Sequence, residues 1–236
     1  MYSFESRVRY SEIDSQGKLS IHSILNYLQD CSTFQSEQLG VGIECLKENQ
    51  MVWVLSFWQV DILKYPVLGE EIEIGTLPYE IKGFLGYRNF FIRNKQGEMY
   101  VKANSLWTLV DIENGRPKKV PQMFIDLYGA EPKIEMEYLE RKFAAPQGEE
   151  RRESSFVVKR HNIDTNDHVN NAQYVSMAMD YIKEPEQIYR LRAEYKKSAL
   201  LNDTIYPIVI TGENCEYVTL CDEDGKAFAN ILFDKG

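Results

Sequence analysis

A short motif that occurs twice is the feature that most limits the fold of this chain. Ile13-Asp14 recurs as Ile163-Asp164, and chemically similar residues follow at matching positions in both segments. After each motif, a pattern typical of one helix and then several patterns typical of strands follow in the same order. We therefore predict two copies of one structural unit, each with one helix and one antiparallel sheet.

The first copy begins its helix at Ser20, a residue type that caps helix N-termini, and ends it near Gly40. Apolar residues recur at helical spacing along this segment. Runs rich in β-branched and aromatic residues, separated by turn signals, then predict four strands. These strands are Met51–Lys64, Glu70–Leu77, Leu85–Arg93 and Glu98–Val110.

The second copy repeats this order. Asn170 or Asn171 caps a helix that extends to about Lys183, and its apolar residues on nearly every side predict burial all round. Four strands follow, and Asp222–Gly225 is typical of a hairpin turn between the last two. The strands are Tyr189–Lys197, Thr204–Thr211, Glu216–Leu220 and Ala227–Phe233.

The segment between the copies, Gly129–Glu153, has no clear periodicity. We interpret it as a linker that crosses the surface, with at most one short helix. The predicted domains are residues 1–128 and residues 154–236, joined by this linker. Because one helix must be buried by an antiparallel sheet in each copy, the sheet has to curl around the helix, and the expected class is α+β.

Residues Asp164–Asn171 read D-T-N-D-H-V-N-N, which resembles the D-x-N-x-H-V-N-N motif of the plant and bacterial acyl-ACP thioesterases. Short segments elsewhere in the chain resemble the family more weakly and occur in the same order, so the resemblance covers nearly the whole chain. It implies a tandem (double) hotdog fold, in which each half is an antiparallel sheet wrapped around a long central helix. It also implies a thioesterase that hydrolyses fatty acyl-ACP to free fatty acid and acyl carrier protein (ACP) in fatty acid biosynthesis.

One position departs from this family. In plant members, the pattern Glu-aromatic-basic-basic is followed by Glu-Cys, whereas Glu194–Lys197 is followed here by Ser198-Ala199. The family's extra catalytic carboxylate would therefore lie where this chain has Ser198, and Ala199 excludes a cysteine nucleophile at the next position. We interpret Ser198 as a structural strand residue that can also hydrogen-bond water.

Asp164, Asn166 and His168 are the predicted catalytic residues. They alternate with a period of two, so in an extended segment their side chains lie on one face, next to the N–H groups that begin the following helix. Asn166 can donate to an oxyanion, His168 can move a proton near neutral pH, and Asp164 can orient His168 or attack the thioester. A metal site formed by His161, Asp164 and His168 is an alternative, although the spacing matches no strong metal motif.

The first copy lacks this set of side chains. It keeps Asp14 but has Gln16 and Lys18 at the positions of Asn166 and His168. Lysine is not a base near neutral pH, because its pKa is far above 7. We therefore assign catalysis to the second half and binding of the acyl chain to the first half.

The composition excludes several classes of partner. A net charge of -9 and a pI near 5.0 argue against nucleic acid and anionic membranes. No apolar run is long enough for a membrane helix, and no secretory leader is visible. Four cysteines without a C-x-x-C pair indicate reduced thiols and a cytoplasmic protein. We expect neither a cofactor nor a metal, and a homodimer is compatible with the sequence.

ACP is acidic, as is this chain, so its binding requires a local basic patch. Basic residues gather near the motif in the sequence, although a solvated charged surface would explain them equally well. The candidates are Arg141, Lys142, Arg151, Arg152, Lys159 and Arg160, with Lys196 and Lys197 as a second group.

Charge does not separate ACP from coenzyme A as the carrier, so an acyl-CoA thioesterase is the closest alternative. A non-catalytic acyl-binding protein is another alternative function. A hotdog dehydratase is less favoured, because the motif differs from the dehydratase pattern.

Overall fold

The computed structural model describes all residues, Met1–Gly236. The chain divides into two compact units. Unit 1 comprises Met1–Ser56 and Ile62–Tyr138, and unit 2 comprises Phe57–Asp61 and Leu139–Gly236. The domain boundaries proposed from the sequence stay a prediction.

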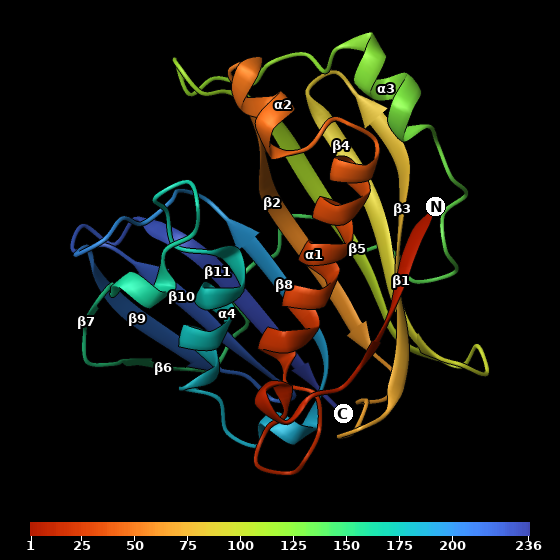
Figure 1. Cartoon of the computed structure of the whole chain (residues 1–236). Helices are drawn as coiled ribbons and strands as arrows, with labels where there is room; N and C mark the ends of the chain where they lie inside the picture. Colours follow the sequence, from red (N-terminus) through yellow and green to blue (C-terminus); the bar gives the residue numbers. More distant parts are fainter. The chain divides into compact units, whose positions relative to one another are not determined.

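Unit 1 holds four complete antiparallel strands in the order β1-β3-β4-β5, with one long helix, α1, against the sheet (Figure 1). Strand β2 begins in this unit. The elements are β1 (Tyr2–Arg7), a 3-10 turn η1 (Tyr10–Glu12), α1 (Ile21–Gln38), α2 (Ile43–Glu48), β2 (Met51–Ile62), β3 (Glu71–Lys82), β4 (Leu85–Asn94), β5 (Met99–Asp111) and α3 (Gln122–Tyr128). The predicted helix and all four predicted strands are confirmed, with shifts of one to a few residues at their ends.

Helix α1 begins where the sequence predicts, because the Ser20 side chain accepts a hydrogen bond from the Ser23 N–H group. Its apolar face packs on the sheet, and Ile24, Leu25 and Leu28 are completely buried. Polar atoms join it to the strands as well: the Cys31 thiol donates to the Ile74 carbonyl at 3.6 Å. The helix is thus fixed against β1 and β3 along its length.

Two short helices that the sequence did not reveal, α2 and α3, close one end of unit 1 (Figure 1). They share a small apolar core with the ends of β2 and β5. Its buried residues are Val41, Met51, Leu109, Val120, Phe124 and Tyr128. Six or seven residues are too few for a clear helical period, which is why the pattern missed them.

Unit 2 repeats the plan with a shorter helix, α4. Its strands run antiparallel in the order β8-β11-β10-β9, and the β2 segment Phe57–Asp61 pairs with β8. The elements are β6 (Glu149–Arg152), β7 (Phe156–Val157), η2 (Arg160–Asn162), α4 (Asn171–Met179), η3 (Pro185–Gln187), β8 (Ile188–Tyr195), β9 (Thr204–Thr211), β10 (Cys215–Cys221) and β11 (Ala227–Lys235). The predicted strands and the hairpin turn at Asp222 are confirmed.

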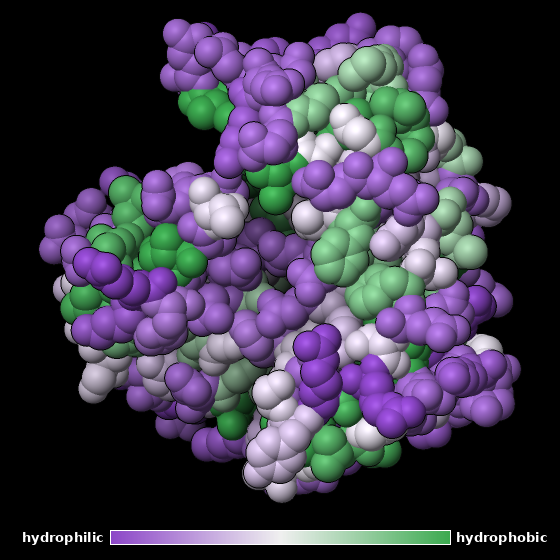
Figure 2. All heavy atoms as spheres, viewed as in Figure 1, coloured by the Kyte–Doolittle hydropathy of each residue, from purple (hydrophilic) through white to green (hydrophobic).

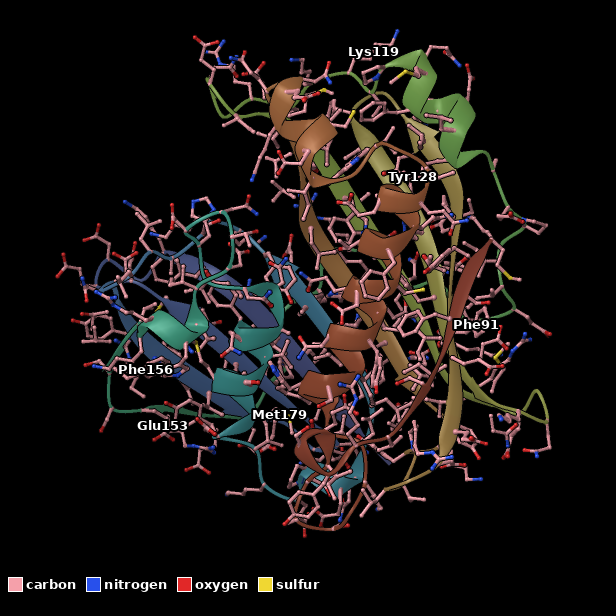
Figure 3. The ribbon with its side chains drawn as sticks, viewed as in Figure 1. Phe91, Lys119, Tyr128, Glu153, Phe156 and Met179 are labelled. Carbon is pink, nitrogen blue, oxygen red and sulfur yellow. The ribbon has the colours of Figure 1, made fainter.

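Helix α4 is shorter than predicted and is not buried all round. It ends at Met179 rather than near Lys183 (Figure 3), because the next N–H groups bond three residues back, as Tyr181 does to Ala178, and Pro185 follows. Gln173 and Ser176 are half exposed, so one side of the helix faces solvent.

The segment predicted as a surface linker makes specific hydrogen bonds in each unit, although most of its residues up to β6 are exposed or half-buried. In unit 1, the hydroxyl of Tyr138 and the N–H group of Ile134 both donate to Asn89 Oδ1, at 2.8 and 3.3 Å, and Asn89 is completely buried. In unit 2, the Leu139 N–H group donates to Gln59 Oε1 at 2.9 Å. The end of the segment forms β6, which pairs with β9. Side-chain contacts of this kind leave no periodic pattern in the sequence.

Most of the surface in view is hydrophilic, and hydrophobic side chains appear there in separate groups (Figure 2). The most exposed large hydrophobic residue is Tyr10, at 82%. None of the helices is both long and apolar enough to span a membrane.

Candidate active site

The predicted catalytic segment is a tight turn rather than an extended strand. The Asp164 N–H group donates to the His168 carbonyl at 2.8 Å, and the Asp167 N–H group donates to the Asp164 carbonyl at 3.2 Å. Asp167 has φ of 60°, the left-handed conformation that a tight turn requires. Isolated pairing of Ile163 with Val169 closes the turn. The period-two argument from the sequence is therefore wrong, because Asp and Asn favour turns of this kind.

The Asp164 carboxylate organises this turn. Its Oδ1 accepts hydrogen bonds from the N–H groups of Asn166 at 2.8 Å and His168 at 3.4 Å. Asp164 is half-buried, whereas the side chains of Asn166 and His168 are exposed. The structure therefore brings the three predicted residues together in one turn, with two of them open to a substrate and the carboxylate at its base.

The first residues of α4 follow directly. Asn170 caps the helix, because its side-chain oxygen accepts from the Ala172 N–H group at 2.9 Å and its carbonyl accepts from the Gln173 N–H group at 2.9 Å. The Asn171 N–H group makes no hydrogen bond. Fewer N–H groups are free here than the sequence suggested, and Asn171 is the backbone donor that remains for an oxyanion.

A second chain segment, residues 198–203, lies beside the turn. The Val169 N–H group donates to the Ala199 carbonyl at 3.0 Å, and His168 pairs with Leu200 as an isolated bridge. The buried Tyr174 hydroxyl of α4 accepts from the Ala199 N–H group at 2.7 Å, and burial raises the pKa of Tyr174 to about 12. Ser198 is exposed next to this pairing, at the position where the family would have its carboxylate.

Unit 1 contains the same turn. Asp14 Oδ1 accepts from the N–H groups of Gln16 at 2.8 Å and Lys18 at 3.0 Å, and the Asp14 N–H group donates to the Lys18 carbonyl at 2.8 Å. Gly17 takes the left-handed position of Asp167, with φ of 76°. The carboxylate of Asp14 thus has the same structural role as that of Asp164, in a copy that lacks the histidine.

The correspondence continues into the second segment. The Leu19 N–H group donates to the Pro66 carbonyl, as Val169 does to Ala199, and Lys18 pairs with Val67, as His168 does with Leu200. Tyr65 therefore corresponds to Ser198. The Lys18 ammonium lies 5.9 Å from the centre of the Tyr65 ring, so the side chains at these two positions are neighbours. Ser198 thus directly precedes the residues that pair with Val169 and His168.

Sequence reasoning did not use this second turn, although a signal exists. Residues 65–70 read Y-P-V-L-G-E and residues 198–203 read S-A-L-L-N-D, with similar residues at the last four positions. Glu70 and Asp203 have the same role, because each carboxylate accepts from a backbone N–H group three residues earlier, at 3.0 and 2.8 Å. Asp203 is thus a turn residue rather than a substitute for the missing carboxylate.

Three of the four cysteines are poorly suited to nucleophilic chemistry. Burial raises the pKa of Cys31 to about 12, and burial also raises the pKa values of Cys215 and Cys221. A thiol with a raised pKa holds little of the reactive thiolate at neutral pH. No group of three or more His, Cys, Asp or Glu side chains is arranged to bind a metal ion, and His161 does not join Asp164 and His168 in such a group.

Half of the predicted basic cluster lies within ion-pair distance of a carboxylate. Arg141 lies 3.5 Å from Glu194, Arg151 lies 2.6 Å from Glu153, and Arg152 lies 3.7 Å from Glu150. Lys196 and Lys197 also have carboxylate partners, Glu194 and Asp222. Within the predicted cluster, the exposed cations without an ion pair are Lys142, Lys159 and Arg160. The last two directly precede the catalytic turn.

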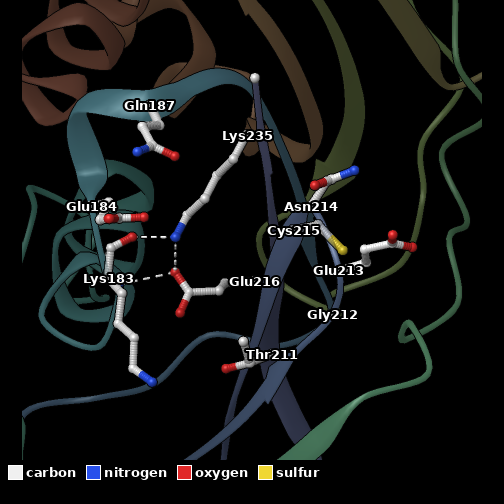
Figure 4. Close-up of a pocket in the computed structure, with 11 residues that line it drawn as sticks. Lys183, Glu184, Gln187, Thr211, Gly212, Glu213, Asn214, Cys215, Glu216 and Lys235 are labelled. Carbon is white, nitrogen blue, oxygen red and sulfur yellow. Dashed lines mark hydrogen bonds and ion pairs between the residues drawn. The ribbon is translucent and has the colours of Figure 1, made fainter.

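A separate pocket of about 220 Å³ lies beyond the other end of α4, around Lys183 (Figure 4). Glu216, with 1% of its surface exposed, accepts from the Lys183 N–H group at 3.0 Å and from the Lys235 ammonium at 2.7 Å. These bonds hold the chain that leaves α4 against β10 and β11. The pocket contains none of the motif residues, so we assign it a structural role.

Comparisons with known proteins show the family of this chain. The family described as "Acyl-ACP thioesterase N-terminal domain" matches residues 1–128, and the one described as "Acyl-ACP thioesterase C-terminal domain" matches residues 146–224. An acyl-[acyl-carrier-protein] hydrolase of Cuphea viscosissima is 22% identical over 216 residues, which are 84% of this chain and 51% of that protein. An oleoyl-acyl carrier protein thioesterase of Arabidopsis thaliana is 23% identical and is matched over 62% of its length. The chain thus spans roughly half to three fifths of these two relatives.

Two solved structures share the fold. An acyl-ACP thioesterase from Bacteroides thetaiotaomicron has a TM-score of 0.88 at 21% identity, with 99% of this chain and 97% of that chain covered. A 12:0-ACP thioesterase from Umbellularia californica has a TM-score of 0.82 at 18% identity, with 98% and 96% covered. The tandem hotdog arrangement that the sequence predicts is confirmed by these matches.

Proposed function

The chain belongs to the acyl-ACP thioesterase family, and from this we propose that it hydrolyses fatty acyl-ACP to free fatty acid and ACP, in fatty acid biosynthesis. The observation that carries the proposal is the difference between the two turns. Both have the same backbone hydrogen bonds, but Asn166 and His168 in unit 2 are replaced by Gln16 and Lys18 in unit 1. Unit 2 therefore keeps the side chains that hydrolysis needs.

In this proposal, His168 is the general base that removes a proton from the attacking water, since imidazole titrates near neutral pH. The side-chain amide of Asn166 and the free Asn171 N–H group stabilise the oxyanion of the tetrahedral intermediate. The thiolate of the carrier then leaves and is reprotonated by the imidazolium. Direct attack by Asp164 is less favourable in this geometry, because its Oδ1 accepts two backbone N–H groups at the base of the turn.

Ser198 alters this scheme relative to plant members of the family. A serine hydroxyl at this position can hydrogen-bond the attacking water, but it cannot remove its proton. We infer that proton transfer falls to His168 alone in this chain. Restoring the carboxylate with Ser198→Glu is then expected to raise the pH at which activity appears, because a nearby negative charge raises the pKa of an imidazole.

Lys159 and Arg160 are the proposed contact for the acidic carrier protein, because they are exposed, lack ion pairs and precede the catalytic turn. Charge reversal of both should raise KM for acyl-ACP by about tenfold with little change in kcat, since such contacts act mainly on association. Arg152→Glu is the matched control, because Arg152 is exposed but already lies near Glu150. The free state of all four cysteines supports a reducing compartment, and we propose the cytoplasm.

The test is incubation with a panel of acyl-ACPs and acyl-CoAs, with released thiol and fatty acid measured in parallel. The proposal expects both products from acyl-ACP, at a rate that falls by 10²-fold or more in His168→Ala. Faster turnover of acyl-CoA would assign the other carrier. Tight binding of acyl-ACP without release of thiol would overturn the enzymatic assignment in favour of an acyl-binding protein.

A further inference from the structure

Arg88 is a buried cation in unit 1 without an anionic partner. It lies on β4 with 8% of its surface exposed. Its Nη1 donates to Gln35 Oε1 of α1 at 2.5 Å and to Thr76 Oγ1 of β3 at 3.2 Å, and its guanidinium carbon lies 5.2 Å from the centre of the Tyr128 ring. All three neighbours are neutral. A buried charge is costly unless an opposite charge accompanies it, so this site lacks an anion.

The unused edge of this guanidinium has the geometry that binds a carboxylate. Because both hydrogen bonds use Nη1, the Nε and Nη2 groups make none within the protein. These two groups point the same way and match the two oxygens of a carboxylate. Unit 2 contains an example of this pairing: Arg190 donates from Nε and Nη2 to the two oxygens of Asp61, at 2.7 and 3.2 Å.

The indole ring of Trp53 lies over the same face of the sheet. Gly86 precedes Arg88 by two positions on β4, so both residues face α1. A Cβ atom at Gly86 would lie 3.3 Å from the ring of Trp53, which places this indole over the same face. Trp53 Nε1 is buried and has no hydrogen-bond partner. The indole atoms nearest Gly86 are Cη2 and Cζ3, on the edge of the ring away from Nε1, so Trp53 contributes an apolar surface near Arg88 and the edge of Arg88 is the donor there.

The surroundings of Arg88 are otherwise apolar or neutral. Tyr128, at the end of α3, bonds Ser36 of α1 through its hydroxyl at 2.8 Å (Figure 3). Phe90, two positions after Arg88, is completely buried, and burial keeps the nearby Cys31 thiol neutral by raising its pKa to about 12. Burial also lowers the pKa of Arg88, which reflects the cost of its charge. A ligand here needs an apolar body as well as an anionic end.

We propose that unit 1 binds a carboxylate carried on a hydrocarbon chain, with the Nε–Nη2 edge of Arg88 as the anchor. A free fatty acid has this chemistry and is the product of the proposed hydrolysis. The choice of a fatty acid therefore rests on the proposed function, whereas the carboxylate rests on the geometry of Arg88. This site is separate from the catalytic turn of unit 2 in its residues and in its chemistry.

The test is calorimetric binding of decanoate and of decanol to the full chain. Arg88→Met should weaken decanoate binding by about tenfold or more, because a charge-assisted hydrogen bond contributes more than 1.4 kcal/mol, the equivalent of tenfold. Decanol binding should change by less than about twofold, since decanol has no charge to lose. Arg93→Met is the matched control: it lies on the same strand, but its Nε already donates to Glu73 at 2.7 Å, so decanoate binding should be unchanged.

A second variant covers the case in which Arg88→Met does not fold, as judged by circular dichroism. Arg88→Lys keeps the positive charge but not the two-pronged edge, and should still weaken decanoate binding by about threefold or more. Absence of decanoate binding in the wild type, or equal binding in the wild type and in a folded Arg88 variant, would overturn the proposal. Acyl-ACP turnover is measured separately, so failure of hydrolysis would overturn the proposed function without changing the binding result.

Discussion

Asp164 has two roles that substitution can separate. Its Oδ1 holds the turn through two N–H groups, and its negative charge lies in the same turn as His168. Asparagine keeps an oxygen acceptor for the N–H groups but removes the charge, whereas alanine removes both. Asp14 offers the matched control, because its carboxylate makes the same two bonds in a copy without histidine.

The size of the structural effect follows from these distances. The bond to Asn166 at 2.8 Å is a normal hydrogen bond, whereas the bond to His168 at 3.4 Å is weak. Removing a side-chain oxygen that caps a turn of this kind costs about 0.5–2 kcal/mol. For a chain of 236 residues, a loss of about 1 kcal/mol lowers Tm by about 2–4 °C. We expect this shift in Asp164→Ala and in Asp14→Ala, and a smaller one in both asparagine variants.

The catalytic effect is expected only in unit 2. Asp164→Asn should lower kcat/KM for acyl-ACP by 10²-fold or more at nearly unchanged Tm, because the imidazolium formed in the reaction loses a nearby negative charge. Both Asp14 variants should retain activity. The assay is released thiol, with Tm measured on the same samples. Activity of Asp164→Asn within about threefold of the wild type, with loss in Asp164→Ala, would refute the electrostatic role and leave only the turn.

Two further predictions test the assignment of catalysis, and a third concerns stability. Lys18→Ala should leave kcat near the wild-type value while His168→Ala lowers it by 10²-fold or more; equal losses in the two folded variants would show that catalysis does not belong to unit 2 alone. Replacing all four cysteines with serine should keep turnover within about tenfold, since no nucleophile is removed, and a covalent adduct trapped on one cysteine would contradict this. Hydrogen bonds from Lys95 and Arg7 hold the pKa of Glu71 at about 2, below its ordinary 4.5. The ionised Glu71 side chain therefore stabilises the folded state fully above pH 4.5, and this contribution is lost as the pH falls towards 2. The Tm of Glu71→Gln should therefore fall less between pH 4.5 and pH 2 than the Tm of the wild type. Equal falls in Tm would contradict a stabilising role of these ion pairs.

The sequence predicted the repeated order of helix and strands, because hydrophobic periodicity and turn residues are local signals. It placed the cap at Ser20 and the hairpin at Asp222 correctly for the same reason. It overestimated α4, since apolar residues continue past Met179, where the N–H groups bond to carbonyls three residues back instead of four. It also missed the packing of residues 131–143, where single contacts such as Tyr138 to Asn89 replace any regular pattern.

The candidate site also has one part that the sequence predicted and one part that it did not. The motif identified Asp164, Asn166 and His168 correctly as neighbours, because they are close in the sequence. The neighbouring segment, with Ala199 and Ser198, comes about thirty residues later and is joined by backbone bonds that any sequence can make. Only its likeness to residues 65–70 marks it, and that likeness becomes convincing once both segments are seen to make the same hydrogen bonds.

The two turns also explain how one copy could lack catalytic side chains and keep its fold. The bonds that build each turn come from the backbone and from one aspartate carboxylate, which both copies retain. Asn166 and His168 are exposed and contribute only their backbone N–H groups to the turn. Exchange for Gln16 and Lys18 therefore costs unit 1 little stability, and Lys18 gains a contact with the Tyr65 ring instead. Structure and chemistry depend on different atoms of the same motif, so the motif is evidence for catalysis only where the histidine is present.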